Sequence, residues 1–350
     1  MREKLALACV VLAMNGACRK GDGARVLDGA GATLPLPLYT KWSTEFTKTD
    51  PSVRVNYQPL GSGAGIRQMS DGVADFGATD EPMTDDQIAH LKGEVVHIPM
   101  TVGGVVIAFN LPGVTELRLT ADTIADVFRG VIARWDDPRL VAVNPGVELP
   151  AQPITIVHRA DGSGTSAAFA TYLAKNSDAW RTEVGAGVAP RFPAGAGARG
   201  NDGVVAFVRT TPLAIGYAEL AYAKSAGLST ALVKNRAGNF IRPEIASLER
   251  AANAVGDVPE DLRVSLVDAA DPGAYPITAL SYLIVPRDAK DRAKGEALAR
   301  FVWWGLHDGQ SYAAALDYAP LPAAIVERAE KAVRSLRVDG QLVAIEKGGG

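Results

Sequence analysis

The segment HRADGSGTSAAF, residues 158–169, combines residue types that either attack or bind a charged group. A nucleophilic serine needs a base, usually a histidine that a carboxylate holds in place. The sequence contains four histidines, and only His158 is near Ser163. Residues 161–165 read DGSGT and do not match the G-x-S-x-G pattern. A phosphatase or serine hydrolase that uses Ser163 is therefore the weaker alternative, and a role in binding a charged group is favoured.

Metal, nucleotide and nucleic-acid sites find no support in the sequence. It has no H-E-x-x-H motif, its only cysteines are Cys9 and Cys18, and its glycine pairs lack both the Walker lysine and the G-x-G-x-x-G spacing. The net charge is −3, and no run of basic residues appears. A nucleic-acid-binding protein normally carries a basic surplus. We therefore predict no catalytic residue, no metal, no cofactor and no nucleic-acid partner.

Three segments place glycine next to serine or threonine immediately before a helical pattern. They are GAGATLP at 29–35, GSGAG at 61–65 and DGSGT at 161–165. A helix start leaves N–H groups without intrahelical partners and carries partial positive charge, and glycine lets an anion approach the backbone. The hydroxyl residues, each of which could also be a plain helix cap, are Thr33, Ser62, Ser163 and Thr165. Three such segments, with Arg159 beside the third, indicate a shared anion site.

Two aspartates accompany these segments. Asp161, two residues after Arg159, is expected to orient the guanidinium through an ion pair. Asp80, in DFGATDEP, is either a helix-start carboxylate or a selectivity residue. An ionised carboxylate can only accept hydrogen bonds, so it favours an anion that still carries a proton. Because unmatched buried acceptors are costly, one such residue can decide which oxyanion binds.

The elements that must position these residues alternate along the chain. Leu38, Trp42 and Phe46 recur at helical spacing, residues 53–58 alternate as in a strand, and residues 73–78 read as a buried strand. The continued alternation predicts an α/β protein with largely parallel sheets.

The length of 350 residues predicts two lobes. Two apolar passages, 102–113 and 276–286, are expected to cross between them, the first through a flexible joint at Gly103-Gly104. The predicted boundaries are residues 26–103 plus 277–345 for lobe I, which is discontinuous, and 104–276 for lobe II.

Residues 1–17 have the layout of an export signal. A basic start precedes an apolar stretch at 5–14 that is too short to span a bilayer, and small residues precede Cys18. Cys18 resembles the acylated cysteine of bacterial lipoproteins, although Asn15 stands where leucine is usual. Lipidation at Cys18 and ordinary secretion both stay open, and both predict a periplasmic or cell-envelope location.

Six motifs, taken in order, resemble one family. They are GAGATLPLPLYTKW, VNYQPLGSGAGIRQ, DFGATDEPM, HRADGSGTSAAF, GNDGVVAFVRTTPLAIGYAELAYA and LDYAPLP. The chain resembles the phosphate-binding proteins of bacterial ABC phosphate transporters from Gly29 into the 330s. The resemblance implies a two-lobed periplasmic-binding-protein fold (type II-like), with a mixed sheet flanked by helices in each lobe and two hinge crossings.

The resemblance also implies a function and a set of ligand positions. It implies a monomer that closes over one inorganic phosphate and delivers it to the membrane permease of an ABC transporter. The implied contacts are Thr33, Leu34, Ser62, Asp80, Arg159, Ser163, Gly164 and Thr165, with Asp161 as the partner of Arg159. The chain departs from the commonest pattern at Leu34, where phenylalanine is common, at His158, and in the Gly-Ala that follows Ser62. A phosphate sensor without transport, or a binder of another oxyanion such as arsenate, stays open.

Overall fold

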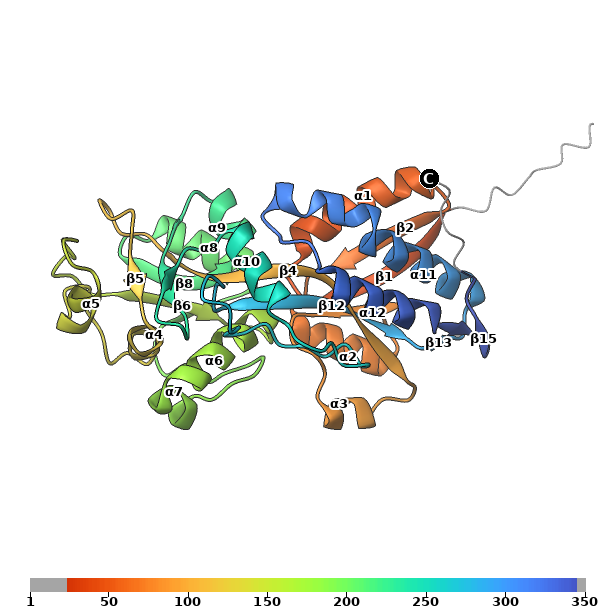
Figure 1. Cartoon of the computed structure of the whole chain (residues 1–350), viewed down its shortest axis with the longest axis horizontal. Coiled ribbons are helices and arrows are strands. Elements are labelled where there is room, and N and C mark those ends of the chain that lie inside the picture. Colours follow the sequence, from red (N-terminus) through yellow and green to blue (C-terminus); the bar gives the residue numbers. More distant parts are fainter. Residues whose placement is uncertain (1–23, 345–350) are drawn as a thin grey trace, which may run out of the picture.

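Two long strands run side by side through the middle of the molecule and connect its two halves (Figure 1). The computed structural model describes residues 24–344, and the two strands are β4 (Val95–Phe109) and β12 (Thr278–Pro286). They pair in antiparallel orientation over the whole length of β12. Apart from the half-buried Val95 and Pro286, all their residues are buried. The hydrophobic core therefore continues along these strands from one half into the other.

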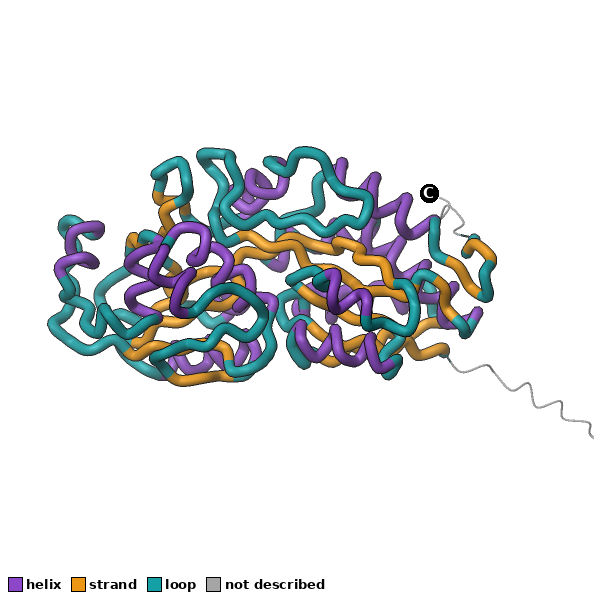
Figure 2. The backbone as a smooth tube through the Cα atoms, turned by 90° about the horizontal axis from the view of Figure 1, so that it is seen from below, coloured by secondary structure: helices purple, strands orange, loops and turns teal. Residues whose placement is uncertain are grey.

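Within residues 24–344 these strands are the centre of a nine-stranded sheet in the order β2-β1-β3-β12-β4-β8-β6-β7, with β9 paired to β4. Figure 2 shows strands, in orange, in both halves of the molecule. On the β12 side the strands are β1 (Arg25–Gly31), β2 (Val53–Gln58) and β3 (Phe76–Thr79). On the β4 side they are β6 (Thr155–Arg159), β7 (Ala196–Ala198), β8 (Ala214–Glu219) and β9 (Ser229–Thr230). Two small sheets lie apart from it: β5 (Arg118–Leu119) with β10 (Leu232–Lys234) and β11 (Phe240–Ile241), and β13 (Asp288–Ala289) with β14 (Arg337–Val338) and β15 (Gln341–Leu342).

Helices flank the sheet in both halves (Figure 1). The half that holds β1 has α1 (Leu36–Thr49), α2 (Ser62–Asp71), α3 (Asp85–Ala89), α11 (Arg292–Leu306) and α12 (Ala323–Arg334), with 3-10 turns at Asp308–Tyr312 and Ala314–Leu316. The other half has α4 (Ala121–Phe128), α5 (Pro138–Val143), α6 (Gly164–Asn176), α7 (Asp178–Glu183), α8 (Gly200–Thr210) and α9 (Leu220–Ser225), and α10 (Ile245–Asn253) lies toward β4. The predicted helical spacing in α1 is confirmed, because Leu38, Trp42 and Phe46 are buried.

The sheet is mixed rather than largely parallel. β1 pairs in parallel with β2 and β3, and β6 pairs in parallel with β7 and β8. β12 is antiparallel to β3 and β4, and β4 is antiparallel to β8. The expectation of largely parallel sheets therefore holds for the outer strands and is wrong at the centre. The chain re-enters the first half from the opposite end through β12, so this strand runs against its neighbours.

The glycine pair Gly103-Gly104 lies inside β4 and is not the point where the strand begins. A Cβ on Gly103 would lie 2.7 Å from a methyl carbon of Leu34, and one on Gly104 would lie 2.8 Å from a methyl carbon of Leu248. The glycines thus permit close packing on both sides of the strand. The expected flexible entry at this pair is wrong, because β4 is already paired from Val95 onward.

No helix in the 24–344 range is both long and apolar enough to cross a membrane. The predicted export signal at 1–17 and the predicted lipidation at Cys18 lie outside the described residues.

Candidate functional site

The three glycine-rich segments come together where the two halves meet. Helices α1, α2 and α6 begin at or directly after these segments, as predicted. The backbone N–H of Gly63 donates to the carbonyl oxygen of Gly162 at 3.0 Å. The N–H of Gly164 donates to the hydroxyl oxygen of Ser62 at 3.0 Å. The starts of α2 and α6, which belong to opposite halves, are therefore in direct contact.

Helix capping explains only one of the four predicted hydroxyl residues. The hydroxyl oxygen of Ser163 accepts the N–H of Ser166 at 3.0 Å and caps α6. The N-cap positions of α1 and α2 are Pro35 and Gly61, neither of which forms a side-chain cap. The other three hydroxyl residues are Thr33, Ser62 and Thr165, and all are buried. Their hydroxyls are thus free for a role other than capping.

Asp80 is a buried carboxyl directly after β3. Its Oδ1 accepts the hydroxyl of Ser281 at 2.8 Å, and its Oδ2 lies 3.5 Å from the hydroxyl oxygen of Ser62. Its backbone N–H also donates to Ser62, at 3.2 Å. Burial raises the pKa of Asp80 to about 7, although the Ser281 hydrogen bond and the charge of Arg159 act in the opposite direction. The carboxyl is therefore a strong, desolvated acceptor at the junction of the halves.

Arg159 ends β6, and its side chain is 1% exposed. Its Nε and Nη2 donate to the two carboxylate oxygens of Asp161 at 2.8 and 2.5 Å. Asp161 also accepts the N–H of Gly200 at 3.1 Å. Burial by itself would raise the pKa of Asp161, but the hydrogen bonds and charge of Arg159 hold this pKa below its usual value. The predicted pairing of Arg159 with Asp161 is present.

The remaining guanidinium nitrogen of Arg159, Nη1, takes no part in the ion pair with Asp161. Nη1 is buried and has no hydrogen-bond partner among residues 24–344. Buried polar groups are nearly always hydrogen-bonded, so such a group calls for an explanation. A cationic donor that is held by a carboxylate on one side and free on the other fits an anionic ligand.

Two tyrosine hydroxyls hold the backbone at Thr33 and Leu34, one from the other half of the molecule and one from the C-terminal part of the chain. The carbonyl of Thr33 accepts the hydroxyl of Tyr222 at 2.7 Å, and the carbonyl of Leu34 accepts the hydroxyl of Tyr318 at 2.7 Å. Leu34 is fully buried, and its side chain packs on Gly103. The loop before α1 therefore has a defined position in the junction.

Sequence reasoning missed several residues that hold the site together. Asn201, at the start of α8, donates to the hydroxyl oxygens of Thr33 at 2.9 Å and Thr165 at 3.3 Å. The hydroxyl of Ser281 donates to the carboxyl of Asp80, and the hydroxyls of Tyr217 and Ser166 form a hydrogen bond of 2.7 Å. The signals were present but weak: Asn201 and Tyr217 belong to the motif GNDGVVAFVRTTPLAIGYAELAYA, and Ser281 is a polar residue in an apolar run.

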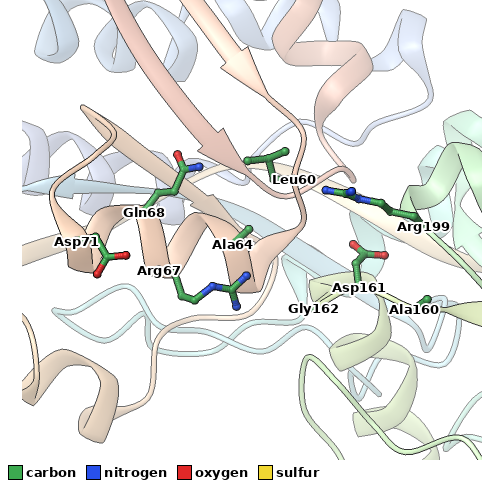
Figure 3. A pocket seen from close by; sticks show the side chains of 9 residues that line it. All are labelled: Leu60, Ala64, Arg67, Gln68, Asp71, Ala160, Asp161, Gly162 and Arg199. Carbon is green, nitrogen blue, oxygen red and sulfur yellow. The ribbon is translucent and has the colours of Figure 1, made fainter.

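A cavity of about 600 Å³ opens beside the site along the seam between the halves (Figure 3). It lies between α2 and the loop that carries Asp161. Its lining residues are Leu60, Ala64, Arg67, Gln68, Asp71, Ala160, Asp161, Gly162 and Arg199. Asp161, which holds Arg159, thus lines this cavity, whereas Asp80 lines a separate cavity of about 480 Å³.

The four histidines, all within residues 24–344, have hydrogen-bond partners other than Ser163, and that of His90 is the carbonyl oxygen of Asp86. His158 Nδ1 contacts the carbonyl oxygen of Arg159 at 3.0 Å, and its ring stacks on Phe192 with centroids 4.4 Å apart. His97 accepts the N–H of Met83, and His307 pairs with Glu330. No group of three or more potential metal ligands occurs among residues 24–344.

Comparison with known proteins places the chain in a family. Its residues 19–304 match the model of the PBP superfamily domain. A protein of Xylella fastidiosa named phosphate-binding protein PstS is 38% identical over 307 residues, which cover 87% of this chain and 84% of that protein. The chain belongs to the PstS family of phosphate-binding proteins. A second member, from Pasteurella multocida, is 37% identical over 87% of this chain and 89% of its own length.

Solved structures agree with this family in fold. A high-affinity periplasmic phosphate-binding protein, solved with bound phosphate, has a TM-score of 0.70 at 22% identity, covering 87% of this chain and 93% of that one. A phosphate ABC transporter substrate-binding protein from Clostridium perfringens has a TM-score of 0.63 at 17% identity, covering 85% of this chain and all of that one. The predicted α/β fold of the two-lobed periplasmic-binding type is thereby confirmed.

Proposed function

We propose that the chain binds inorganic phosphate, as hydrogen phosphate or dihydrogen phosphate, and delivers it to the membrane permease of an ABC importer. Relatives that are 38% and 37% identical over 87% of the chain carry the name phosphate-binding protein. The single observation that carries the proposal for this chain is the buried Nη1 of Arg159, which has no partner among residues 24–344, together with the buried carboxyl of Asp80. A buried acceptor and a buried guanidinium with one unpartnered nitrogen lie close enough for the charge of Arg159 to lower the pKa of Asp80.

The ligand positions follow from this pairing. The anion's charge would be met by Arg159 Nη1, by four hydroxyls, and by the backbone N–H groups of Leu34 and Gly164, the second of which donates to Ser62 in this structure and would exchange that acceptor for the anion. The hydroxyl residues are Thr33, Ser62, Ser163 and Thr165. Asp80 Oδ2 would accept the proton that the phosphate still carries. Sulfate at neutral pH has no such proton, so it would place an acceptor against an acceptor.

We also propose that closure brings these groups together. The lobes would be residues 26–103 plus 277–345 and residues 104–276, hinged about β4 and β12. Support comes from contacts between the halves, such as Ser62 with Gly164, and Lys224 with Asp317 at 2.6 Å. A ligand that contacts both lobes stabilises the closed arrangement.

The testing experiment is a titration of the purified chain with phosphate, sulfate and arsenate, followed by calorimetry and by the fluorescence of its five tryptophans. We expect phosphate to bind and sulfate to bind at least tenfold more weakly, since an unpaired buried acceptor costs about 1–3 kcal/mol. Equal binding of sulfate and phosphate would refute the role of Asp80. Tighter binding of arsenate than of phosphate would favour the other-oxyanion alternative.

Transport and location complete the proposal. We propose that the chain acts outside the cytoplasmic membrane as a monomer, either tethered through Cys18 or free. Restored phosphate uptake in cells that lack their own binding protein would separate transport from a purely sensory role. The hydrolase alternative is not favoured, because the hydroxyl of Ser163 caps α6 and His158 stacks on Phe192. A phosphate-ester and acyl-ester hydrolysis assay checks this directly.

A further inference from the structure

The side chain of Asn201 is fully buried at the junction and its orientation is determined by its neighbours. Its Oδ1 accepts the backbone N–H of Glu219 at 3.0 Å. A backbone N–H can only donate, so the carbonyl oxygen of the amide must face Glu219. The amide nitrogen therefore faces the two threonines, to which it donates at 2.9 Å for Thr33 and 3.3 Å for Thr165.

This arrangement decides where the threonine protons point. A hydroxyl has one proton to donate and lone pairs to accept. Because Thr33 and Thr165 each accept from Asn201, neither can direct its own proton at the amide. Each proton must point elsewhere. Thr33 precedes α1 and Thr165 lies in the first turn of α6, so the same amide also joins the two halves.

Ser62 is prepared in the same way. Its hydroxyl oxygen accepts the N–H of Asp80 at 3.2 Å and the N–H of Gly164 at 3.0 Å. With both lone pairs engaged, its proton is left to donate, and in this structure it faces Asp80 Oδ2 at 3.5 Å. Three hydroxyls of the junction thus accept from N–H groups and keep their own protons to donate.

We propose that Asn201 is a positioning residue that turns the hydroxyl protons of Thr33 and Thr165 toward the bound oxyanion. The inference rests on the proposed function, since that function makes these threonines ligand contacts. Asn201 itself need not touch the ligand. It makes the two hydroxyls donors in advance, so that little reorientation is required when the anion arrives.

A matched control exists in Asn144. It is 2% exposed, its amide nitrogen donates to the carbonyls of Leu140 at 2.8 Å and Arg118 at 3.0 Å, and its Oδ1 accepts the N–H of Arg118 at 2.7 Å. It has the same number of bonds as Asn201, but its acceptors are carbonyls that have no proton to orient. Asn144→Asp therefore also replaces a buried amide with a carboxylate, but it leaves the direction of the Thr33 and Thr165 hydroxyl protons unchanged.

The first test compares Asn201→Ala and Asn201→Asp with the unaltered chain and with Asn144→Asp, by phosphate calorimetry and by thermal unfolding without phosphate. A carboxylate accepts the threonine protons and turns them away from the ligand. We expect affinity to fall about tenfold in Asn201→Ala and at least about a hundredfold in Asn201→Asp, as for the loss and the reversal of hydrogen bonds to a charged group. Asn144→Asp should lower the unfolding temperature and leave the affinity unchanged.

The second test separates hydroxyl polarity from simple charge repulsion. In a Thr33→Val, Thr165→Val background there are no protons to orient, so the affinity gap between Asn201→Asp and Asn201→Ala should shrink at least tenfold. An undiminished gap in that background would overturn the inference, as would equal affinities of the two variants in the native background. Failure of the unaltered chain to bind phosphate would instead overturn the proposed function and the inference with it.

Discussion

Replacing Asp80 by asparagine should stabilise the ligand-free protein at alkaline pH while it weakens selectivity. The carboxyl is buried, and its pKa is raised from 3.8 to about 7. In the unfolded chain the same group ionises near its ordinary value. Between these two values the folded protein holds a proton that the unfolded chain has released. The stabilisation of the folded protein by this bound proton is therefore complete below about pH 4 and is lost as the pH rises to about 7.

The size of the effect follows from the shift. A rise of about three pKa units corresponds to about 4 kcal/mol of stability that the ionised carboxyl removes above pH 7. Asparagine has nearly the same shape, can still accept the hydroxyl of Ser281, and carries no charge. We expect the unfolding free energy of Asp80→Asn to exceed that of the native chain by a few kcal/mol at pH 8. At pH 5 this excess should be smaller by about 3 kcal/mol.

The assay is denaturant unfolding of phosphate-free protein at pH 5 and pH 8. The exposed Asp257, replaced by asparagine, is the matched control for the exchange of a carboxylate for an amide. In parallel, phosphate and sulfate affinities of Asp80→Asn should approach each other at pH 8, because the amide can donate to either anion. If the stability gain of Asp80→Asn is equal at both pH values, the desolvated carboxylate is not the cause. If discrimination against sulfate is fully kept, Asp80 does not select the protonated anion.

Further predictions concern the other groups of the site. Arg159→Ala should weaken phosphate binding by about 3 kcal/mol in calorimetry, as for a lost charged hydrogen bond, and unchanged affinity would remove this residue from the site. Gly164→Ala places a Cβ 2.5 Å from the Cβ of Asp80, so closure should fail and affinity should fall at least about tenfold, whereas Gly93→Ala, with open space around it, should bind normally. Ser281→Ala removes a hydrogen bond that lowers the pKa of Asp80, so this pKa should rise. On acidification, the variant should therefore begin to lose its discrimination against sulfate at a higher pH than the native chain.

Local sequence was sufficient for the parts of the site that depend on neighbours in the chain. The ion pair of Arg159 with Asp161 joins residues two apart, and the helix start at Gly164 follows from the serine that caps it. Leu38, Trp42 and Phe46 predicted the buried face of α1. Short-range geometry and hydrophobic periodicity are encoded within a few residues, which is why these predictions hold.

Contacts between distant segments were beyond such reasoning. The hydroxyl of Ser281 reaches Asp80 across 201 positions of sequence, and Asn201 reaches Thr33 across 168. The glycine pair in β4 looked like a joint because nothing in its neighbourhood shows that Leu34 packs against it. Likewise, the alternation of helices and strands could not show that β12 returns antiparallel through the centre.

The sequence alone determined the donor groups, the acceptor and the guanidinium, together with the helix starts that carry them. Only the tertiary structure decided which oxygen of Asp80 is engaged, which nitrogen of Arg159 is left over, and which way the threonine hydroxyls face. The physical reason is that residue type specifies how many hydrogen bonds a group can form, whereas the partners it meets depend on how the two halves pack along β4 and β12.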